Sequence, residues 1–326
     1  MKKISKKNNS NFLIITTPSF KKEWQKEIKS ISKNAKFLFI EDDKKKIIKN
    51  VKKANVMIGC PRYVFKNEDF NYFKHLNWIH AGGAGIEQFI SKEFKESKII
   101  FTNGKIIQGP EVADHALGLI LSFTRNLYKI SKNVDLLKID RPIEIKDKKV
   151  LIIGMGGIGV CIAERLKTFG AYIDGISNDL IPMMSFINKI YLSKDINNIA
   201  KNYDIIVCAA PLTTKTKYML NYKFFMQMKK NSIFINVSRG KIVRTEDLIK
   251  KNIYKKFRGI GLDVTDPEPL DENNLLKKAS NVFITPHVAG PSDNNRFRGF
   301  NLIKENITRY MKGESLVNVV DKNKEY

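Results

Sequence analysis

KVLIIGMGGIGVCIAERLKTFGAYIDGIS, residues Lys149 to Ser177, has the order strand, glycine loop, helix and strand in one continuous run. Val150 to Ile153 form an apolar run typical of a buried strand, and Val160 to Phe169 carry apolar residues at helical spacing. Gly170 is expected to end this helix, and Tyr172 to Ile176 are expected to form the second strand. The run therefore predicts a βαβ unit of a Rossmann-type doubly wound parallel sheet in an α/β protein.

The loop between the first strand and the helix matches the pattern G-x-G-x-x-G, with the residues Gly154, Met155, Gly156, Gly157, Ile158 and Gly159. In this pattern one glycine makes a tight turn, the next lets a pyrophosphate approach the backbone, and the last packs the helix on the strand. The phosphates then face free N–H groups at a helix N-terminus. Within a complete βαβ context the loop predicts dinucleotide binding, against the alternative of a glycine-rich turn in another α/β fold.

Length and composition indicate a globular protein of two domains, because 326 residues with 43% apolar and 10% aromatic content can form two cores. The net charge of +25 would suit a nucleic-acid-binding protein, but the lysines are spread over the whole length. We therefore expect a solvated basic surface that helps to attract anionic ligands, and no nucleic-acid partner.

The cysteines and the N-terminus favour a cytoplasmic protein. Cys60, Cys161 and Cys208 are widely spaced in apolar surroundings, so neither a disulfide framework nor a metal site is expected. The apolar run that begins at Phe12 stops at Pro18 and is too short for a signal peptide. No membrane segment is expected elsewhere in the chain.

Strands and helices alternate along the rest of the chain and predict two α/β regions. The first region has expected strands at residues 12–15, 36–40, 56–59, 78–80 and 99–102 and expected helices at 21–31, 45–52, up to 76, and 86–90. The second begins with a long helix at 111–128 and has further strands at 190–192, 205–209, 232–237, 259–264 and 282–284. After a last helix at 301–311, the apolar residues Leu316, Val317, Val319 and Val320 need a core to join, and the first region offers one. We thus expect a smaller discontinuous domain of residues 1–108 completed by 293–326, and a dinucleotide-binding domain of residues 109–292.

Three motifs follow predicted strands, where a parallel sheet places its functional residues. Arg239, in NVSRG, has a planar fork suited to a carboxylate, although a strand-end arginine can also simply cap carbonyl groups. Glu268 is held between two prolines in DVTDPEPL, where an ordinary surface loop is the alternative. His287, in TPHVAG, is a candidate general acid/base, although a lone histidine is more often structural.

Two further features have chemical potential. Asp263 is flanked by apolar residues in a predicted strand, where a carboxylate needs a partner. A second glycine-rich loop follows the strand at residues 78–80, and its backbone N–H groups are suited to an anion: Ala81, Gly82, Gly83, Ala84 and Gly85.

In this order and spacing, the motifs resemble the D-isomer-specific 2-hydroxyacid dehydrogenases over nearly the whole chain. The resemblance rests on residues 78–87 (WIHAGGAGIE), 112–115, the glycine loop, Pro211 to Thr213 with Thr216, NVSRG, DVTDPEPL, TPHVAG and the closing segment 301–319. It implies that the smaller domain is flavodoxin-like.

The resemblance also implies a catalytic set of Arg239, Glu268 and His287. Arg239 would bind the 2-oxoacid carboxylate and polarise its carbonyl, while His287 donates the proton as hydride arrives at C2. Glu268 would orient the imidazole and favour its protonated form. By the same resemblance, the loop of residues 81–85 binds the substrate carboxylate, Asp263 accepts a hydrogen bond from the nicotinamide carboxamide, and Pro211 and Thr216 belong to the cofactor site.

The implied function is NAD(P)H-dependent reduction of a small 2-oxoacid, of the glyoxylate or hydroxypyruvate type, to the D-2-hydroxyacid. Alternatives are another dehydrogenase of the family, such as phosphoglycerate dehydrogenase, or a non-enzymatic, dinucleotide-sensing protein similar to a corepressor. A homodimer formed through the dinucleotide domain and the helix at residues 112–128 is also implied, and the apolar face of that helix supports it.

The end of the second strand bears on the choice of cofactor. An NAD enzyme normally has an acidic residue there for the ribose 2′-hydroxyl, whereas this chain has Ser177, followed by Asn178 and Asp179. Neutral Ser177 and Asn178 can accept a 2′-phosphate that a carboxylate would repel. No arginine follows, and Asp179 would serve if the alignment slips by two residues. We therefore expect NADPH or NADH as cofactor, with NADPH used at least as well as NADH.

Overall fold

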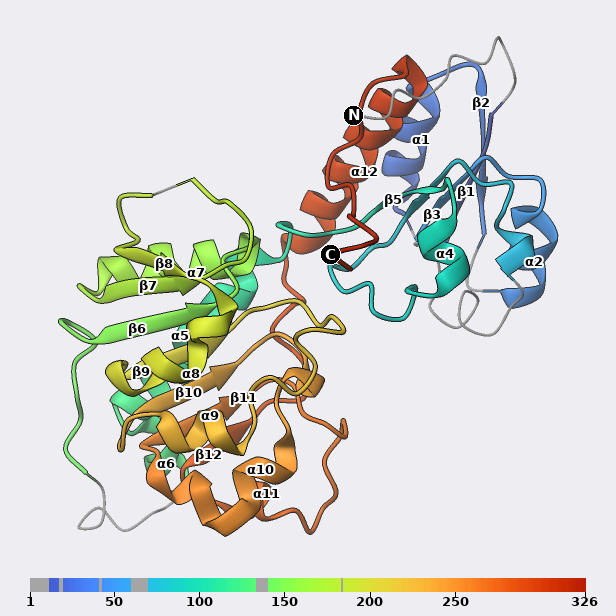
Figure 1. The fold of residues 1–326 in the computed structure, drawn as a ribbon. Coiled ribbons are helices and arrows are strands. Elements are labelled where there is room, and N and C mark those ends of the chain that lie inside the picture. Colours follow the sequence, from blue (N-terminus) through green and yellow to red (C-terminus); the bar gives the residue numbers. More distant parts are fainter. Residues whose placement is uncertain (1–11, 18–19, 41–42, 60–69, 133–139, 183) are drawn as a thin grey trace. The chain divides into compact units, whose positions relative to one another are not determined.

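A computed structural model describes residues 12–17, 20–40, 43–59, 70–132, 140–182 and 184–326. The chain forms two compact units, one of Met1–Ile107 with Asp293–Tyr326 and the other of Gln108–Ser292. Each unit is built on one parallel sheet with helices on its faces, which confirms the predicted α/β class (Figure 1).

The smaller unit has a five-stranded sheet in the order β2-β1-β3-β4-β5, the order of flavodoxin-like folds. Its strands are β1 (Phe12–Thr16), β2 (Ala35–Phe39), β3 (Val56–Ile58), β4 (Trp78–His80) and β5 (Ile100–Thr102). Its helices are α1 (Lys22–Ser30), α2 (Lys44–Val51), the 3-10 helix η1 (Phe70–Tyr72), α4 (Lys92–Glu96) and α12 (Asn295–Lys312). All of the strand pairs are parallel.

The C-terminal segment packs into this unit. Phe300 of α12 stacks on Trp24 of α1, with ring centroids 4.5 Å apart. After Gly313 ends α12 in a left-handed conformation, Leu316 and Val320 are buried in the two cores on either face of the sheet. The other two apolar residues of the tail, Val317 and Val319, are exposed.

Two expected helices of this unit are wrong. Where a helix was expected to end at Leu76, residues 70–75 form η1 and a turn, and residues 87–89 form a turn instead of a helix. Ile86 and Phe89 are buried three residues apart, which imitates helical spacing. The helix starts later because the Ser91 hydroxyl caps α4 by accepting a hydrogen bond from Phe94 N.

The larger unit has a seven-stranded sheet in the order β12-β11-β10-β9-β6-β7-β8. Its strands are β6 (Lys149–Ile153), β7 (Tyr172–Ile176), β8 (Lys189–Tyr191), β9 (Ile205–Cys208), β10 (Ile233–Asn236), β11 (Gly259–Leu262) and β12 (Val282–Ile284). All of the pairs are parallel, and the strand order reverses between β6 and β9, as in a Rossmann fold. The predicted doubly wound sheet is confirmed.

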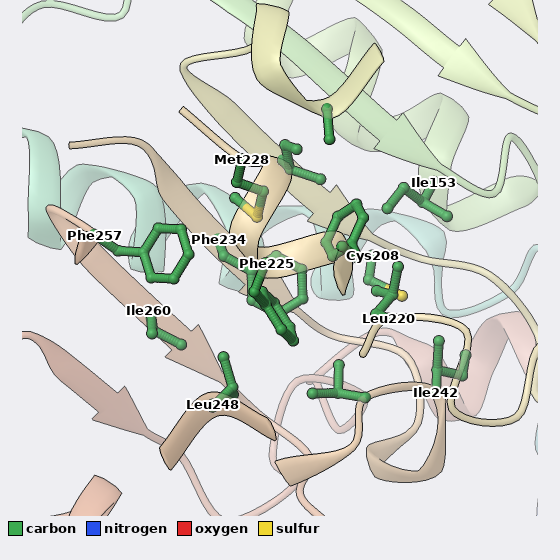
Figure 2. Packing of buried hydrophobic residues seen from close by; sticks show 14 of the residues in the cluster. Ile153, Cys208, Leu220, Phe225, Met228, Phe234, Ile242, Leu248, Phe257 and Ile260 are labelled. Carbon is green, nitrogen blue, oxygen red and sulfur yellow. The ribbon is translucent and has the colours of Figure 1, made fainter. Parts of the chain in front are cut away.

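Helices cover both faces of the larger sheet. They are α5 (Gly109–Thr124), α6 (Leu127–Ser131), α7 (Gly157–Thr168), α8 (Ile196–Ile199), α9 (Tyr222–Gln227), α10 (Thr245–Ile249) and α11 (Leu275–Lys278). Short 3-10 helices lie at η3 (Ser193–Asp195), η4 (Ala200–Asn202), η5 (Gly240–Ile242) and η6 (Lys250–Lys256). One of the two cores packs Phe225, Phe234 and Ile260 together (Figure 2).

The long helix expected at residues 111–128 is instead two helices. α5 begins earlier, at Gly109, because Pro110 is tolerated in a first turn, where no N–H is needed. It ends at Thr124, and Asn126 adopts a left-handed φ of 60°. Buried Arg258 stabilises this break by donating to Phe123 O at 3.1 Å and to Asn126 Oδ1 at 3.0 Å.

None of the helices in the described ranges is long and apolar enough to cross a membrane. Those ranges also contain no cluster of His, Cys, Asp and Glu side chains that could hold a metal ion. Cys161 and Cys208 are free thiols, whereas Cys60 and Pro18 lie outside the described residues.

A buried histidine lies at the end of β4. The Trp78 indole donates to Thr102 Oγ1 at 2.8 Å, and His80 Nδ1 lies 2.8 Å from the same oxygen. Since Thr102 accepts from Trp78, its own proton is available to a neutral imidazole. Burial lowers the pKa of His80 to about 4 from an ordinary value of 6.5.

We predict that the smaller unit loses stability in mild acid because of His80. Between pH 6.5 and 4 the unfolded chain binds a proton that the folded unit does not, so the free energy of unfolding falls as the pH drops. From pH 7 to pH 5 this one group contributes a loss of about 2 kcal/mol. Urea unfolding followed by tryptophan fluorescence measures it, because both tryptophans, Trp24 and Trp78, lie in the smaller unit.

The comparison is with His80→Asn, which retains a polar atom near the Nδ1 position and should show a flatter pH dependence. His75→Asn, at an exposed position, should behave as the unchanged protein does. Equal pH dependence in all three proteins would contradict the prediction.

Candidate functional site

The glycine loop after β6 has a geometry that fits a dinucleotide. Gly154 has a φ of 97°, and a Cβ there would lie 2.5 Å from the Ala210 Cα. A Cβ on Gly159 would lie 2.0 Å from Gly154 O, so only glycine lets α7 approach β6. A Cβ on Gly156 would meet nothing within 4 Å, so the fold itself does not require glycine there. The open space at Gly156 lies at the N-terminus of α7, where the first N–H groups of a helix have no intrahelical partner, and it suits a phosphate.

The other loop residues are packed to different degrees. Met155 is buried, and its side chain lies against Gly175 of β7, where a Cβ would approach Met155 Cγ to 2.4 Å. Gly157 begins α7, and Ile158 is half-buried in its first turn. Met155 thus holds the loop to the neighbouring strand, which the motif alone does not indicate.

The turn after β7 places Ser177 and Asn178 differently. The Ser177 hydroxyl donates to Asp179 O at 2.9 Å and accepts from Asp179 N at 3.1 Å, which closes a tight turn. The Asn178 amide forms two hydrogen bonds with Ser193, to its hydroxyl at 2.9 Å and from its N–H at 3.1 Å. Ser193 follows β8, and the exposed Lys194 comes next. No motif in the sequence points to Lys194, although the parallel order of β7 and β8 brings the carboxyl ends of these strands together.

Pro211 and Thr216 meet in the loop after β9. The Thr216 hydroxyl donates to Pro211 O at 2.7 Å and accepts from Thr213 N at 2.8 Å. The same loop begins at Ala209 and Ala210, and Ala210 contacts the Gly154 turn. The structure therefore brings together the two loops that the sequence analysis assigned to the cofactor.

Glu268 and His287 form a close pair in the larger unit. His287 Nδ1 lies 2.6 Å from Glu268 Oε1. Since an ionised carboxylate only accepts hydrogen bonds, Nδ1 carries the proton and Nε2 is left to exchange a proton with a ligand. The two side chains are 45% and 42% exposed, so both can be reached from solvent.

Asp263 fixes the loop that contains His287. Its carboxylate is 2% exposed, accepting from Thr285 Oγ1 at 2.6 Å, Val288 N at 2.9 Å and Ala289 N at 3.1 Å. These bonds supply the partners that a buried carboxylate needs. The structure thus gives Asp263 a role in shaping the loop, which the sequence analysis did not assign.

A second histidine reaches the same group. His115 Nε2, from α5, lies 2.9 Å from Thr285 Oγ1 and 3.4 Å from Asp263 Oδ1. Because Thr285 donates to Asp263, its oxygen is free to accept from His115. His115 thereby links α5 to the loop of His287, and only its place in the motif at residues 112–115 had drawn attention to it.

Arg239 follows β10 and is half-buried. Asn236 Nδ2 donates to Arg239 O at 3.2 Å, and the guanidinium donates to Ser238 O at 2.8 Å. A Cβ on Gly240 would lie 1.8 Å from Thr265 O, so only glycine lets the Arg239 loop approach the Glu268 loop. Arg239, Glu268 and His287 thus lie on loops that follow three neighbouring strands, β10, β11 and β12.

The loop of residues 81–85 belongs to the smaller unit. Ala81 N continues the sheet by donating to Thr102 O, whereas Gly83 O and Ala84 O accept from Gly104 N and Asn103 Nδ2. Within the described part of the chain, the backbone N–H groups of residues 82–85 donate no hydrogen bond. A Cβ on Gly82 or Gly83 would meet nothing within 4 Å, which leaves the backbone open to an anion.

Comparisons with known proteins point to one family. Residues 117–289, more than half of the chain, match the NAD-binding domain of D-isomer-specific 2-hydroxyacid dehydrogenases. The chain is 28% identical over 282 residues to D-3-phosphoglycerate dehydrogenase of Methanocaldococcus jannaschii, covering 85% of this chain but 54% of that protein. It is 27% identical over 294 residues to glyoxylate reductase of Thermofilum pendens, covering 86% of this chain and 85% of that protein.

Solved structures share the fold. The NADPH-dependent glyoxylate/hydroxypyruvate reductase of Sinorhizobium meliloti, in complex with NADP and sulfate, superposes with a TM-score of 0.78 at 21% identity. The match covers 97% of this chain and 100% of that structure. Taken with the matched family domain and the glycine loop, the chain belongs to the D-isomer-specific 2-hydroxyacid dehydrogenase family and is an NAD(P)-dependent oxidoreductase.

Proposed function

We propose that the protein reduces a small 2-oxoacid, of the glyoxylate or hydroxypyruvate type, to the D-2-hydroxyacid with NAD(P)H. The observation that supports this most directly is the 2.6 Å pair of His287 and Glu268, on a sheet edge shared with Arg239. The relatives named glyoxylate reductase, which match along most of their own length, favour the small substrate.

Each residue has a distinct chemical part in this proposal. The nicotinamide, when bound, exchanges a hydride with the substrate. His287 Nε2 donates a proton to the substrate oxygen, and Glu268 holds the imidazole through Nδ1. Arg239 grips the substrate carboxylate with its planar fork and polarises the carbonyl. For the loop at residues 81–85 in the smaller unit, we propose that the N–H groups of residues 82–85 bind an anion, because an anion is the ligand they fit.

The cofactor site follows the same logic. We assign the pyrophosphate to the glycine loop at Gly156 and the nicotinamide end to Pro211, Thr216 and Asp263. The turn of Ser177 and Asn178 is assigned to the 2′ position of the adenosine ribose. In this assignment the Asp263 carboxylate accepts a hydrogen bond from the nicotinamide carboxamide in addition to the three from the His287 loop.

A phosphorylated substrate is the second candidate, because the Methanocaldococcus jannaschii relative is named a phosphoglycerate dehydrogenase. This chain spans about half the length of that relative. Assays with glyoxylate, hydroxypyruvate and 3-phosphohydroxypyruvate, each with both cofactors, discriminate between the two candidates. If the protein reduced none of the three substrates, the proposed function would be wrong.

His287→Ala should lower kcat by roughly 10²- to 10⁴-fold with little change in cofactor affinity, because the proton donor is lost. Arg239→Ala should raise KM for the 2-oxoacid sharply and also lower kcat, because the grip and the polarisation are lost together. Steady-state kinetics on the best substrate measures both. His75→Ala, at an exposed position in the smaller unit, is the control. Wild-type turnover in either variant would show that its assigned role is wrong.

NADPH should be used at least as well as NADH, because no carboxylate occupies position 177. Ser177→Asp should move the ratio of kcat/KM toward NADH by repelling the 2′-phosphate. Lys194→Ala should weaken the binding of NADPH but not of NADH, because Lys194 supplies the positive charge near the 2′-phosphate. The Asn178 amide cannot replace it, since it already donates to Ser193. A preference of the unchanged protein for NADH of tenfold or more would refute this and point to Asp179.

We further propose a cytoplasmic homodimer with no nucleic-acid partner, joined through the larger unit. The free thiols support the compartment, and the exposed apolar residues Leu127 (55%) and Ile130 (50%) of α6 support the interface.

Light scattering should give a mass of about 75 kDa, twice the 37.5 kDa of the chain. Leu127→Glu with Ile130→Glu should lower this mass, because two charges would have to be buried at the interface. Leu192→Glu, at another exposed apolar position, is the control. A monomer at micromolar concentration would contradict the dimer.

A further inference from the structure

Tyr218 links the loops that follow three neighbouring strands of the larger sheet. It lies in the loop after β9, and its N–H donates to Lys241 O, in the loop after β10, at 2.8 Å. Its hydroxyl donates to Asp266 Oδ2, in the loop after β11, at 2.6 Å. One residue therefore joins the loop assigned to the cofactor with the loops that contain Arg239 and Glu268.

The backbone of Tyr218 is strained, and the contacts of its side chain explain why a tyrosine occupies this position. Its φ is 54°, in the left-handed region that glycine and asparagine occupy more readily than a bulky residue. The ring is flanked by cations, with the Arg244 guanidinium 5.2 Å and the Lys217 ammonium 5.4 Å from its centroid. Glycine would relieve the backbone but would lose the hydroxyl that reaches Asp266.

Asp266 is close to Glu268 along a restricted segment. Pro267 and Pro269 fix the backbone on either side of Glu268. The Thr265 hydroxyl donates to Pro267 O at 2.7 Å, and Thr265 N donates to Glu268 Oε2 at 3.4 Å. A constraint on Asp266 is thereby passed to Glu268, whose other oxygen lies 2.6 Å from His287 Nδ1.

The link persists over the pH range in which a histidine exchanges protons. The hydrogen bond that Tyr218 donates to Asp266 raises the pKa of the phenol above its ordinary value of 10. Tyr218 therefore stays protonated, and its bond intact, while an imidazole titrates near neutral pH.

We infer that Tyr218 is a positioning residue, which holds Glu268, and through it His287, by its hydrogen bond to Asp266. The inference rests on the proposed function, which gives His287 and Glu268 their catalytic roles. The effect of Tyr218 on the position of His287 can nevertheless be tested without measuring catalysis.

Tyr218→Phe removes only the hydroxyl. We expect kcat for the 2-oxoacid to fall about tenfold, in line with the loss of one hydrogen bond to a charged group. KM for the 2-oxoacid should stay within about twofold, because the contact with the Arg239 loop is made by the Tyr218 backbone. Tyr172→Phe, an exposed tyrosine at the start of β7, is the matched control and should leave both constants unchanged.

The partner variants distinguish positioning from general destabilisation. Asp266→Ala should resemble Tyr218→Phe, and the double variant should be no worse than either, because both remove one bond. Asp266→Asn retains an acceptor oxygen and should recover most of kcat. Additive losses, or a lower melting temperature with unchanged kcat, would overturn the inference.

A second measurement needs no substrate. The chain has four histidines, and 13C labelling of them, with His287→Ala to identify the signal, gives one resonance for His287. We expect this resonance to shift or broaden in Tyr218→Phe but not in Tyr172→Phe. An unchanged His287 resonance would overturn the inference even in an active enzyme. Should the unchanged protein reduce no 2-oxoacid, the proposed function fails, and the resonance still decides whether Tyr218 positions His287.

Discussion

Parallel pairing is the constraint on which both units depend. Every pair of neighbouring strands in the two sheets runs in the same direction, so each connection must cross back over a face of the sheet. The carboxyl ends of all the strands in a sheet consequently emerge at one edge. In the larger unit this places the glycine loop, the Ser177 turn, Arg239, Glu268 and His287 on loops of a single edge, although they span more than a third of the chain. The common direction of the strands is therefore enough to bring these loops to one edge of the sheet.

The sequence could predict the features that depend on local spacing. The glycine loop can be recognised from its own residues, because the turn at Gly154 and the close approach at Gly159 each require glycine. Buried strands are visible as apolar runs, and the parallel direction of the strands follows from their alternation with helices. The likeness to a known family then led to Arg239, Glu268 and His287, two of which the structure brings within hydrogen-bonding distance.

Contacts between distant loops could not be predicted in this way. Nothing near Asn178 indicates that its amide will bind Ser193, and nothing near position 125 indicates that Arg258 will end α5. The buried side of a turn also imitates a helix, as at Ile86 and Phe89. The spacing of apolar residues indicates which side chains are buried. Which polar groups pair depends instead on which loops the sheet brings together. Those pairings are obligatory once the groups are buried, as the bonds to Asp263 show.

The close approach at Gly240 has a consequence for how this protein can change over time. Any side chain at this position would collide with the Thr265 carbonyl, so a substitution of Gly240 would displace the loop of Arg239, the loop of Glu268, or both. A mutation that reshapes one loop must therefore be accommodated by the other. Gly82 and Gly83 are not coupled to another loop in this way, because a Cβ at either position would meet nothing within 4 Å.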